Sequence, residues 1–317
     1  MKITFLDSAS LGPGLDLSTF TRWGEVDFWE NTAREDRVPR LRGATVAIAN
    51  RVPFDDEVLT ACPDLKLILL TATGYNNVDL EAARRRGVAV CNVVGYSTES
   101  VAQHTFALLL ALMEQTAWLD GYAKTRWPGS TTFGHLDRPF HEIAGKTWGI
   151  VGMGTIGARV ARLAEAFGAA PRYFSTSGVD RSAEYPRLEL EALLRTSDIV
   201  TIHSPLNDAT RGLLGERELG LMKPSAYLVN VGRGGIVDEA ALARALDAGT
   251  IAGAALDVTL PEPPVASNPL FALQRPERLV VSPHLAWASI EARNRCLAEV
   301  GLNLQAWLDG QRRNRLD

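Results

Sequence analysis

The sequence has few cysteines and no long apolar run, and each shortage excludes a class of protein. Three cysteines, Cys62, Cys91 and Cys296, are scattered over 317 residues without C-x-x-C spacing. They predict reduced, structural thiols in a cytoplasmic protein. No apolar run approaches the roughly 20 residues of a membrane span. The apolar part of MKITFLDSAS is too short for a signal peptide, so we expect no membrane partner and no secretion.

An excess of charge of one sign is also missing. The chain carries 33 Lys and Arg against 37 Asp and Glu, a net charge of −4 at pH 7. The two signs are mixed along the chain, which argues against nucleic acid or an anionic membrane as the main partner. The hydrophobic content of 46% suffices for one large core or two smaller ones, and the length favours two domains.

Short β-rich apolar runs alternate with helical patterns, as in parallel α/β proteins. In the first part, strands are predicted in KITFLD, ATVAIAN, LKLILLTAT and VAVCNV. The segment DLEAARRRG predicts a helix that begins after Asp79 and ends at Gly87. From Ser97 a helical pattern, apolar on most faces, continues to about residue 124. We expect one long helix there, running from one domain into the other.

A second βα series follows a loop rich in glycine, proline and aromatic residues. Its predicted strands are TWGIV, APRYF, DIVTIH, AYLVNV, IAGAALDV and RLVVSPH, with helices at about 155–168, 188–196, 215–221 and 238–248 and a terminal helix in SIEARNRCLAEVGLNLQAWLDG. The predicted fold is two Rossmann-like domains with doubly wound parallel sheets and a deep cleft between them. Residues 1–100 with 285–317 would form a flavodoxin-like domain, and residues 101–284 a dinucleotide-binding domain.

A glycine-rich turn marks the second domain as a nucleotide site. Gly152, Gly154 and Gly157 have G-x-G-x-x-G spacing between the strand of WGIV and a helix that begins at Thr155 and Ile156. The first glycine permits the tight turn, the second lets the backbone approach a pyrophosphate, and the third lets helix pack on strand. The helix N-terminus supplies N–H groups to the phosphates. A ligand-free glycine turn is the weaker alternative.

The acid that normally ends the next strand and binds the adenosine ribose is missing, and Ser175 and Thr176 stand in its place. The hydroxyls of STSG can bind a ribose or a phosphate, and Arg181 could pair with a phosphate. Loss of the acid removes the repulsion of a 2′-phosphate, so the cofactor is NAD or NADP with a slight preference for NADP. An NAD enzyme with a relaxed site is the alternative.

Further polar residues follow later strands. Arg233 lies in a glycine-rich turn, Asp257 and Glu262 follow the next strand, and His284 follows the last. An arginine between glycines in a core is costly unless its charge meets a partner.

His135, Asp137, His141 and Glu142 lie close together in the sequence, but we expect loop polar groups there and no metal site.

These segments together resemble the D-isomer-specific 2-hydroxyacid dehydrogenase family over nearly the whole chain. The matching segments are TATGYNNVDLEAARRRGVAV, STESVAQHT, GIVGMGTIG, IHSPLNDATRGL, NVGRGGIVDE, LDVTLPEPP and SPHLAWAS. The resemblance implies an active site of Arg233, Glu262 and His284. His284 would donate and recover the proton, Glu262 would hold its other ring nitrogen, and Arg233 would bind the carboxylate and polarise the carbonyl.

The resemblance also implies cofactor and substrate contacts. His203, Pro205 and Val231 would line the cofactor and Asp257 would bind its carboxamide, although His203 could equally be a satisfied strand-end histidine. The substrate would meet Asn50, Arg51, the backbone N–H groups of Thr73 and Gly74, and Trp287.

Trp287 in SPHLAWAS, with SVAQHT and NVDLEAA, makes the chain most similar to glycerate dehydrogenases, also called hydroxypyruvate or glyoxylate reductases. We therefore predict an NAD(P)-dependent oxidoreductase acting on the CH–OH group of a small D-2-hydroxy acid. The alternatives are a dehydrogenase of a bulkier D-2-hydroxy acid, or a nucleotide-sensing, corepressor-like protein. The family is usually dimeric, so we expect a homodimer, to which the aromatic segment TRWPGSTTF could contribute.

Overall fold

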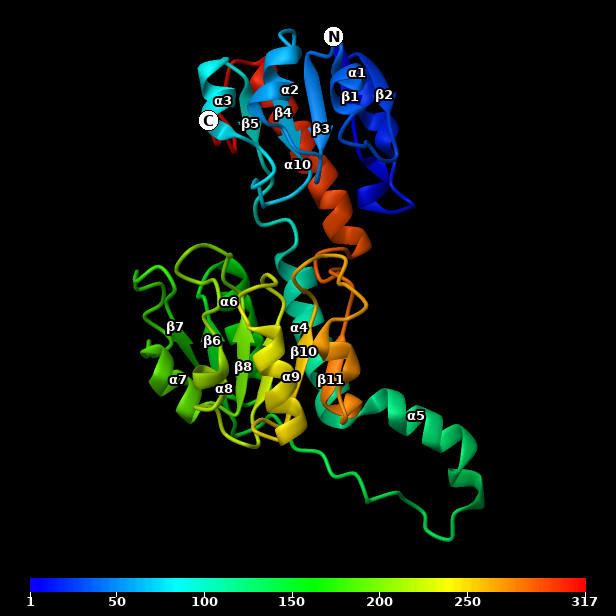
Figure 1. The fold of residues 1–317 in the computed structure, drawn as a ribbon, viewed down its shortest axis with the longest axis vertical. Helices are drawn as coiled ribbons and strands as arrows, with labels where there is room; N and C mark the ends of the chain where they lie inside the picture. Colours follow the sequence, from blue (N-terminus) through cyan, green and yellow to red (C-terminus); the bar gives the residue numbers. More distant parts are fainter. The chain divides into compact units, whose positions relative to one another are not determined.

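The computed structural model describes all 317 residues, which form two compact units. Unit 1 comprises residues 1–97 and 288–317, and unit 2 comprises residues 98–287. Each unit contains one parallel β-sheet with helices packed on it (Figure 1). The predicted class, two parallel α/β domains, is therefore confirmed.

The sheet of unit 1 has five parallel strands in the order β2-β1-β3-β4-β5. They are β1 (Lys2–Phe5), β2 (Glu25–Phe28), β3 (Val46–Ala49), β4 (Leu67–Leu70) and β5 (Ala89–Cys91). This 2-1-3-4-5 order is that of flavodoxin-like sheets. All four residues of β4 are buried, because both faces of a parallel sheet are covered.

The helices of unit 1 are α1 (Arg37–Leu41), α2 (Asp56–Ala61), α3 (Leu80–Arg85) and α10 (Ile290–Leu308). Residues of α2 and α3 share an apolar core with Ile68 and Leu70 of β4. Helix α10 packs against β4 as well. The start of α3 follows the prediction, since the Asp79 carboxylate accepts the N–H of Ala82. The edge strand β2 and the short helices α1 and α2 were not predicted.

The sheet of unit 2 has six parallel strands in the order β11-β10-β9-β8-β6-β7. They are β6 (Thr147–Val151), β7 (Ala170–Phe174), β8 (Ile199–Ile202), β9 (Tyr227–Asn230), β10 (Gly253–Leu256) and β11 (Leu279–Val281). Arg187 forms a further parallel bridge with Tyr173 of β7. If that bridge is counted as the third strand in sequence order, the sheet has the Rossmann order 3-2-1-4-5-6 with β11 added at the edge.

Two apolar cores cover the faces of this sheet. Helices α4 (Thr98–Glu114) and α6 (Thr155–Ala166) contribute to one core, which holds Phe106 and Trp148. Helices α7 (Leu190–Thr196), α8 (Glu216–Leu219) and α9 (Glu239–Ala248) contribute to the other (Figure 1). The unit is therefore doubly wound.

The single long helix predicted over residues 97–124 is wrong in two respects. Gln115 adopts the left-handed conformation, with φ 52°, and divides the segment into α4 and α5 (Thr116–Thr125). The Gln115 Oε1 accepts a hydrogen bond from Arg138 Nη1 at 2.6 Å, a contact from far along the chain. Because α4 begins at Thr98, the first residue of unit 2, the helix does not run from one unit into the other.

Helix α5 and the chain that returns from it form an arm, residues 115–142, that extends away from the sheet (Figure 1). No residue of α5 is buried. Short 3₁₀ helices complete the secondary structure at Ser8–Leu11, Leu17–Trp23, Trp127–Gly129, Pro269–Ala272 and Pro276–Arg278.

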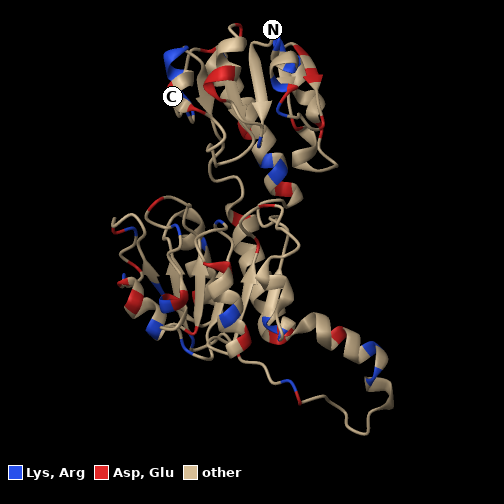
Figure 2. Cartoon of the chain, in the orientation of Figure 1, with Lys and Arg blue, Asp and Glu red and all other residues tan.

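Charged side chains of both signs are mixed over the molecule (Figure 2), and the cysteines are buried as free thiols. Residues of both signs are interspersed over both units (Figure 2). None of the helices has both the length and the apolar character that crossing a membrane requires. All three cysteines are free and buried. Burial raises the pKa of Cys91 to about 11 and that of Cys296 to about 12, so neither thiol is an effective nucleophile at neutral pH.

Candidate active site

The carboxyl ends of five neighbouring strands of unit 2 lie at one level. The strand register pairs Val151 with Ile202, Asn230 with both Ile202 and Leu256, and Leu256 with Val281. The loops after these strands therefore leave the same edge of the sheet, where ligands of open α/β sheets bind. The residues that directly follow the strands are Gly152, His203, Val231, Asp257 and Ser282.

The turn after β6 requires its glycines. Gly152 has φ +97°, and a Cβ there would lie 2.9 Å from the backbone N of Ser204. A Cβ on Gly157 would lie 2.2 Å from the carbonyl oxygen of Gly152. Beside Gly154 there is open space, and no side chain caps the N-terminus of α6. The turn thus presents uncapped N–H groups to an open space, the arrangement that a pyrophosphate requires.

His203 and Ser204, on the turn after β8, have unmet hydrogen-bonding groups. Both ring nitrogens of His203 and the hydroxyl of Ser204 are buried without a partner in the protein. Burial lowers the pKa of His203 to about 3, so its imidazole is neutral, with one donor and one acceptor. Such groups carry a free-energy cost unless a ligand satisfies them. Because Gly152 packs against Ser204, these groups lie beside the glycine turn.

The loop after β7 uses Ser175 internally. The Ser175 hydroxyl donates to the carbonyl of Val179 at 2.6 Å, and Ser175 is only 5% exposed. Gly178, with φ +74°, completes the turn. Thr176 is partly exposed, whereas the Arg181 side chain is exposed and forms no ion pair in the structure. The outward groups of this loop are therefore the neighbours of Ser175 rather than its own hydroxyl.

Arg233 lies on the turn after β9, and the side chain of Asn230 shapes that turn. Asn230 Nδ2 donates to the Arg233 carbonyl at 2.9 Å, and its Oδ1 accepts the N–H of Gly232 at 3.0 Å. The expectation of a core arginine is wrong, because Arg233 is exposed. Its guanidinium donates to the Gly232 carbonyl and pairs with no carboxylate. An exposed, unneutralised guanidinium is suited to binding an anionic group.

Glu262 and His284 form a close pair. His284 Nδ1 lies 2.6 Å from Glu262 Oε2, and Glu262 Oε1 accepts the N–H of Thr259 at 3.2 Å. Thr259 also touches the arginine turn, because a Cβ on Gly234 would lie 1.9 Å from the Thr259 carbonyl oxygen. The turn that carries Arg233 therefore packs against the loop that carries Glu262.

The backbone of His284 is held in an uncommon conformation. His284 has φ 51°, in the left-handed region that costs free energy for residues other than glycine. Its N–H donates to the Asp257 carbonyl at 2.8 Å, and its own carbonyl accepts Trp287 Nε1–H at 3.1 Å. Contacts on both sides of the residue hold the orientation that directs the imidazole to Glu262.

Asp257 holds the segment around His284. Its carboxylate is 1% exposed and accepts the N–H groups of Leu285 and Ala286, each at 2.9 Å, and the hydroxyl of Ser282 at 2.6 Å. The sequence predicts a contact between this carboxylate and the cofactor carboxamide. The structure shows three of its hydrogen bonds made within the protein. Of the other predicted cofactor contacts, Pro205 is exposed and Val231 is buried.

The predicted substrate residues of unit 1 also follow strand ends. Asn50 and Arg51 come after β3, and Asp7 accepts their N–H groups at 2.9 and 2.7 Å. Burial raises the pKa of Asp7 although these hydrogen bonds oppose the shift. After β4, the Thr73 hydroxyl donates to the Val93 carbonyl and the Thr73 carbonyl accepts from Asn92 Nδ2, so the backbone N–H groups of Thr73 and Gly74 are what this turn offers a ligand. The role of Asp7 was not predicted, although an aspartate two residues after a strand was a usable signal.

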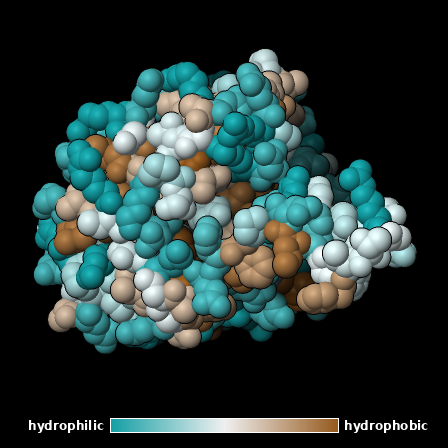
Figure 3. Space-filling view, turned by 90° about the horizontal axis from the view of Figure 1, so that it is seen from below, coloured by the Kyte–Doolittle hydropathy of each residue, from teal (hydrophilic) through white to brown (hydrophobic).

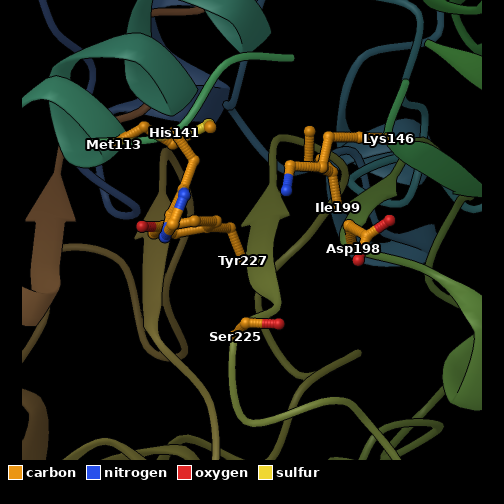
Figure 4. A pocket seen from close by; sticks show the side chains of 7 residues that line it. All are labelled: Met113, His141, Lys146, Asp198, Ile199, Ser225 and Tyr227. Atoms are coloured by element: carbon orange, nitrogen blue, oxygen red, sulfur yellow. The ribbon is translucent and has the colours of Figure 1, made fainter. Parts of the chain in front are cut away.

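A separate pocket lies at the opposite, amino edge of the unit 2 sheet (Figure 4). It has a volume of about 200 Å³ and is lined by Met113, His141, Lys146, Asp198, Ile199, Ser225 and Tyr227. Asp198 pairs with Lys223 at 2.9 Å. No predicted site residue lines this pocket. Among the His, Cys, Asp and Glu side chains of the chain, no group of three could hold a metal ion; His135 instead stacks on Tyr122.

Comparison with known proteins identifies the family. Residues 106–286 match the model of the D-isomer specific 2-hydroxyacid dehydrogenase, NAD binding domain. A glycerate dehydrogenase of Methylorubrum extorquens is 38% identical over 99% of this chain and 98% of its own. A glyoxylate reductase of Aeropyrum pernix is 42% identical over 93% of this chain and 90% of its own.

Solved structures agree. An acyclic imino acid reductase in complex with NADPH and D-Arg superposes with a TM-score of 0.89 at 29% identity, with all of both chains covered. Because this neighbour is named for another substrate, the substrate has to be argued from side chains rather than from the fold. The chain belongs to the D-isomer-specific 2-hydroxyacid dehydrogenases, a family of NAD(P)-dependent oxidoreductases.

Proposed function

We propose that this protein transfers a hydride between NAD(P)H and a small 2-keto acid, reducing hydroxypyruvate or glyoxylate to D-glycerate or glycolate. The observation that carries the proposal is the 2.6 Å pair of His284 and Glu262 on the sheet edge that also presents Arg233 without a carboxylate partner. The names of the two relatives, glycerate dehydrogenase and glyoxylate reductase, favour substrates of this size.

The residues divide the chemistry between them. NAD(P)H, when bound, supplies the hydride to the keto carbon. His284 donates a proton from Nε2 to the oxygen that becomes the hydroxyl, and recovers it in the reverse direction. Glu262 accepts a hydrogen bond from Nδ1–H, which fixes the tautomer and stabilises the imidazolium. Arg233 binds the substrate carboxylate and stabilises negative charge developing on the keto oxygen.

Trp287 favours a small substrate. Its indole N–H is held by the His284 carbonyl, so the ring is anchored beside the proposed acid. A large aromatic ring there leaves room for a one- or two-carbon substituent on the keto carbon better than for a long chain. Replacing Trp287 with Ala should lower kcat/KM for glyoxylate and raise it for a branched 2-keto acid. An unchanged ratio would remove Trp287 from substrate selection.

We propose a slight preference for NADP over NAD. The strand β7 ends without an acid, and the free Arg181 guanidinium lies on the loop that follows. Arg181→Ala should weaken NADPH binding several-fold and leave NADH binding nearly unchanged. Ser175→Asp should shift preference towards NADH, because a carboxylate cannot donate to the Val179 carbonyl as the serine hydroxyl does and would turn outward to the ribose. If neither variant changes the ratio of the two affinities, the selectivity lies elsewhere.

The two units divide the work, in our proposal. Unit 2 binds the dinucleotide through the glycine turn and the unmet groups of His203 and Ser204. Unit 1 is the substrate domain, where Asn50, Arg51 and the backbone N–H groups of Thr73 and Gly74 recognise the acid. The three buried free thiols suit a reducing, cytoplasmic environment.

We propose that the protein is a homodimer formed through the arm. Phe133 and Leu136 on the arm are 96% and 84% exposed, and Trp127 and Phe140 are also exposed. On the face seen from below, brown apolar residues are interspersed among teal hydrophilic ones (Figure 3). Exposed apolar groups gathered on one segment are typical of an interface. Sedimentation should give twice the chain mass of 34.4 kDa, and Phe133→Ser with Leu136→Ser should give monomer. A monomeric wild type would overturn this.

The test of the main proposal is an absorbance assay at the reduced-nicotinamide band. Hydroxypyruvate, glyoxylate, pyruvate and a branched 2-keto acid are each assayed with NADH and with NADPH. Fastest turnover of hydroxypyruvate or glyoxylate is the expected result. Turnover of the branched acid alone would favour a dehydrogenase of bulkier acids. Cofactor binding without turnover of any keto acid would favour a nucleotide sensor.

A further inference from the structure

Helix α4 brings a second histidine to the segment that holds His284. His104 Nε2 lies 2.9 Å from the hydroxyl of Ser282 and 3.7 Å from Asp257 Oδ1. The Ser282 hydroxyl is in turn 2.6 Å from Asp257 Oδ1. His104 has no part in the chemistry described above, and its position in a mostly apolar helix calls for a reason.

The hydrogen-bond directions in this chain follow from the chemistry of its members. An ionised carboxylate only accepts, so the single proton of the Ser282 hydroxyl is donated to Asp257. The Ser282 oxygen is then the acceptor for His104, which must carry a proton on Nε2. His104 therefore donates a hydrogen bond to Ser282, and Ser282 donates one to Asp257.

Asp257, whose carboxylate is oriented by Ser282, in turn accepts hydrogen bonds from the backbone of His284 and of the two residues that follow it. Its carboxylate accepts the N–H groups of Leu285 and Ala286, and its carbonyl accepts the N–H of His284. The segment would otherwise relax, because the left-handed conformation of His284 is unfavourable. Fixing the rotation of the Asp257 carboxylate fixes this segment.

We propose that His104 is a positioning residue that acts through Ser282 and Asp257 to hold the main chain of His284, so that the imidazole keeps its bond to Glu262. The proposal rests on the proposed function of His284 as the proton donor. Loosening the segment would lengthen the 2.6 Å contact with Glu262 and weaken the stabilisation of the imidazolium. Misplacing a reacting group by about 1 Å can cost up to roughly 100-fold in rate.

Two substitutions at His104 separate the N–H donor from the bulk of the ring. His104→Leu removes the donor, and His104→Gln restores an N–H to the same side of α4. We expect kcat to fall about tenfold in His104→Leu, with the dissociation constant of NAD(P)H within about twofold of wild type. His104→Gln should recover most of the lost kcat. Gln103→Leu, the exposed neighbour on the same helix, is the matched control and should behave as wild type.

Ser282→Ala tests the relay without a large side-chain change, and it serves if His104→Leu does not fold. In a double-mutant cycle, the two single losses should not add, because either one breaks the same chain. Additive losses would overturn the proposal. So would a kcat within twofold of wild type in a folded His104→Leu, or a His104→Gln no better than His104→Leu.

A measurement without turnover distinguishes failure of this proposal from failure of the proposed function. The NMR signal of the His284 Nδ1 proton, which reports the bond to Glu262, should move in His104→Leu and in Ser282→Ala and return in His104→Gln. An unchanged signal in both folded variants would overturn the positioning role. A moved signal in a protein that reduces no 2-keto acid would instead overturn the proposed function and leave the positioning role intact.

Discussion

The two units share one arrangement at the carboxyl edges of their sheets, in which a buried aspartate that follows one strand holds the loop after the neighbouring strand. In unit 1, Asp7 follows β1 and accepts N–H groups of Asn50 and Arg51 after β3. In unit 2, Asp257 follows β10 and accepts those of Leu285 and Ala286 after β11. In both, a carboxylate supplies acceptors for backbone donors that would otherwise be unmet.

The two arrangements differ in the groups that donate hydrogen bonds to the aspartate carboxylate. Asp257 accepts a hydrogen bond from the Ser282 hydroxyl, whose oxygen lies 2.9 Å from His104 Nε2 of α4. The donors to Asp7 are backbone N–H groups, and burial raises its pKa. The loop in unit 2 carries a residue in the left-handed region, whereas the loop in unit 1 does not. The loop that holds a side chain in a costly backbone conformation is thus the one whose carboxylate also accepts a hydrogen bond from a side chain.

The largest expected effect comes from the side chain that the unit 2 loop presents. His284→Ala should lower kcat by roughly 10³-fold, within the range for loss of a general acid. NAD(P)H affinity should stay within about twofold, because the proposed role is chemical. The variant is assayed with hydroxypyruvate and by cofactor fluorescence, beside His141→Ala as an exposed control. Activity equal to wild type would end the assignment of His284.

Next comes the carboxylate that holds this loop. Asp257→Asn keeps the size but replaces one acceptor oxygen with a donor that faces N–H groups, so the segment should shift. We expect kcat to fall about 100-fold. Asp238→Asn is the matched control, since Asp238 also accepts a backbone N–H, at the start of α9. If both variants lose the same small amount, the unit 2 arrangement is ordinary capping and the comparison fails.

Much of the fold could be predicted from the sequence because its signals are local. Apolar runs of four or five residues identified the core strands, and Asp79 marked the start of α3. The edge strand β2 was missed because EVDF is only half-buried, so it lacks the apolar run. The break at Gln115 was missed because its partner, Arg138, is brought there only by tertiary structure.

The candidate site shows the same division. Glycine spacing and strand-end positions pointed to Gly152, Arg233 and His284, because each follows a predictable strand. The inward hydrogen bond of Ser175 and the exposure of Arg233 were not predictable, since they depend on loop conformation. His104 was passed over because a single histidine in an apolar helix has no local pattern that reveals its partner in another segment.

A smaller effect is expected from breaking the arrangement in unit 1. Asp7→Asn should free the backbone of Asn50 and Arg51, which we assign to substrate recognition rather than to proton transfer. KM for the keto acid should rise about tenfold while kcat stays within about threefold, the pattern of lost uniform binding. Asp16→Asn, at an exposed aspartate that caps a 3₁₀ helix, is the control. A loss confined to kcat would contradict the division of roles.

The smallest effect is on stability. As pH falls, the contributions of Asp7 in unit 1 and His203 in unit 2 to the free energy of unfolding should change in opposite directions. The pKa of Asp7 is raised in the folded state, so the folded chain binds more protons than the unfolded chain above about pH 4. The contribution of Asp7 to the free energy of unfolding is therefore greatest in acid and declines as pH rises through the raised pKa. His203 behaves inversely. Its pKa is lowered from 6.5 to about 3, so its contribution is complete above pH 6.5 and is lost as pH falls towards 3.

Thermal unfolding of Asp7→Asn, His203→Asn and wild type between pH 4 and 8 tests both signs. Relative to wild type, His203→Asn should gain stability on acidification, by roughly 3 °C, and Asp7→Asn should lose it. His141→Asn, at an exposed histidine, should parallel the wild type. Hydrogen exchange resolved to β1 and β8 would assign each change to its unit. If both variants change with the same sign, burial of these two groups does not set the pH dependence of the two units.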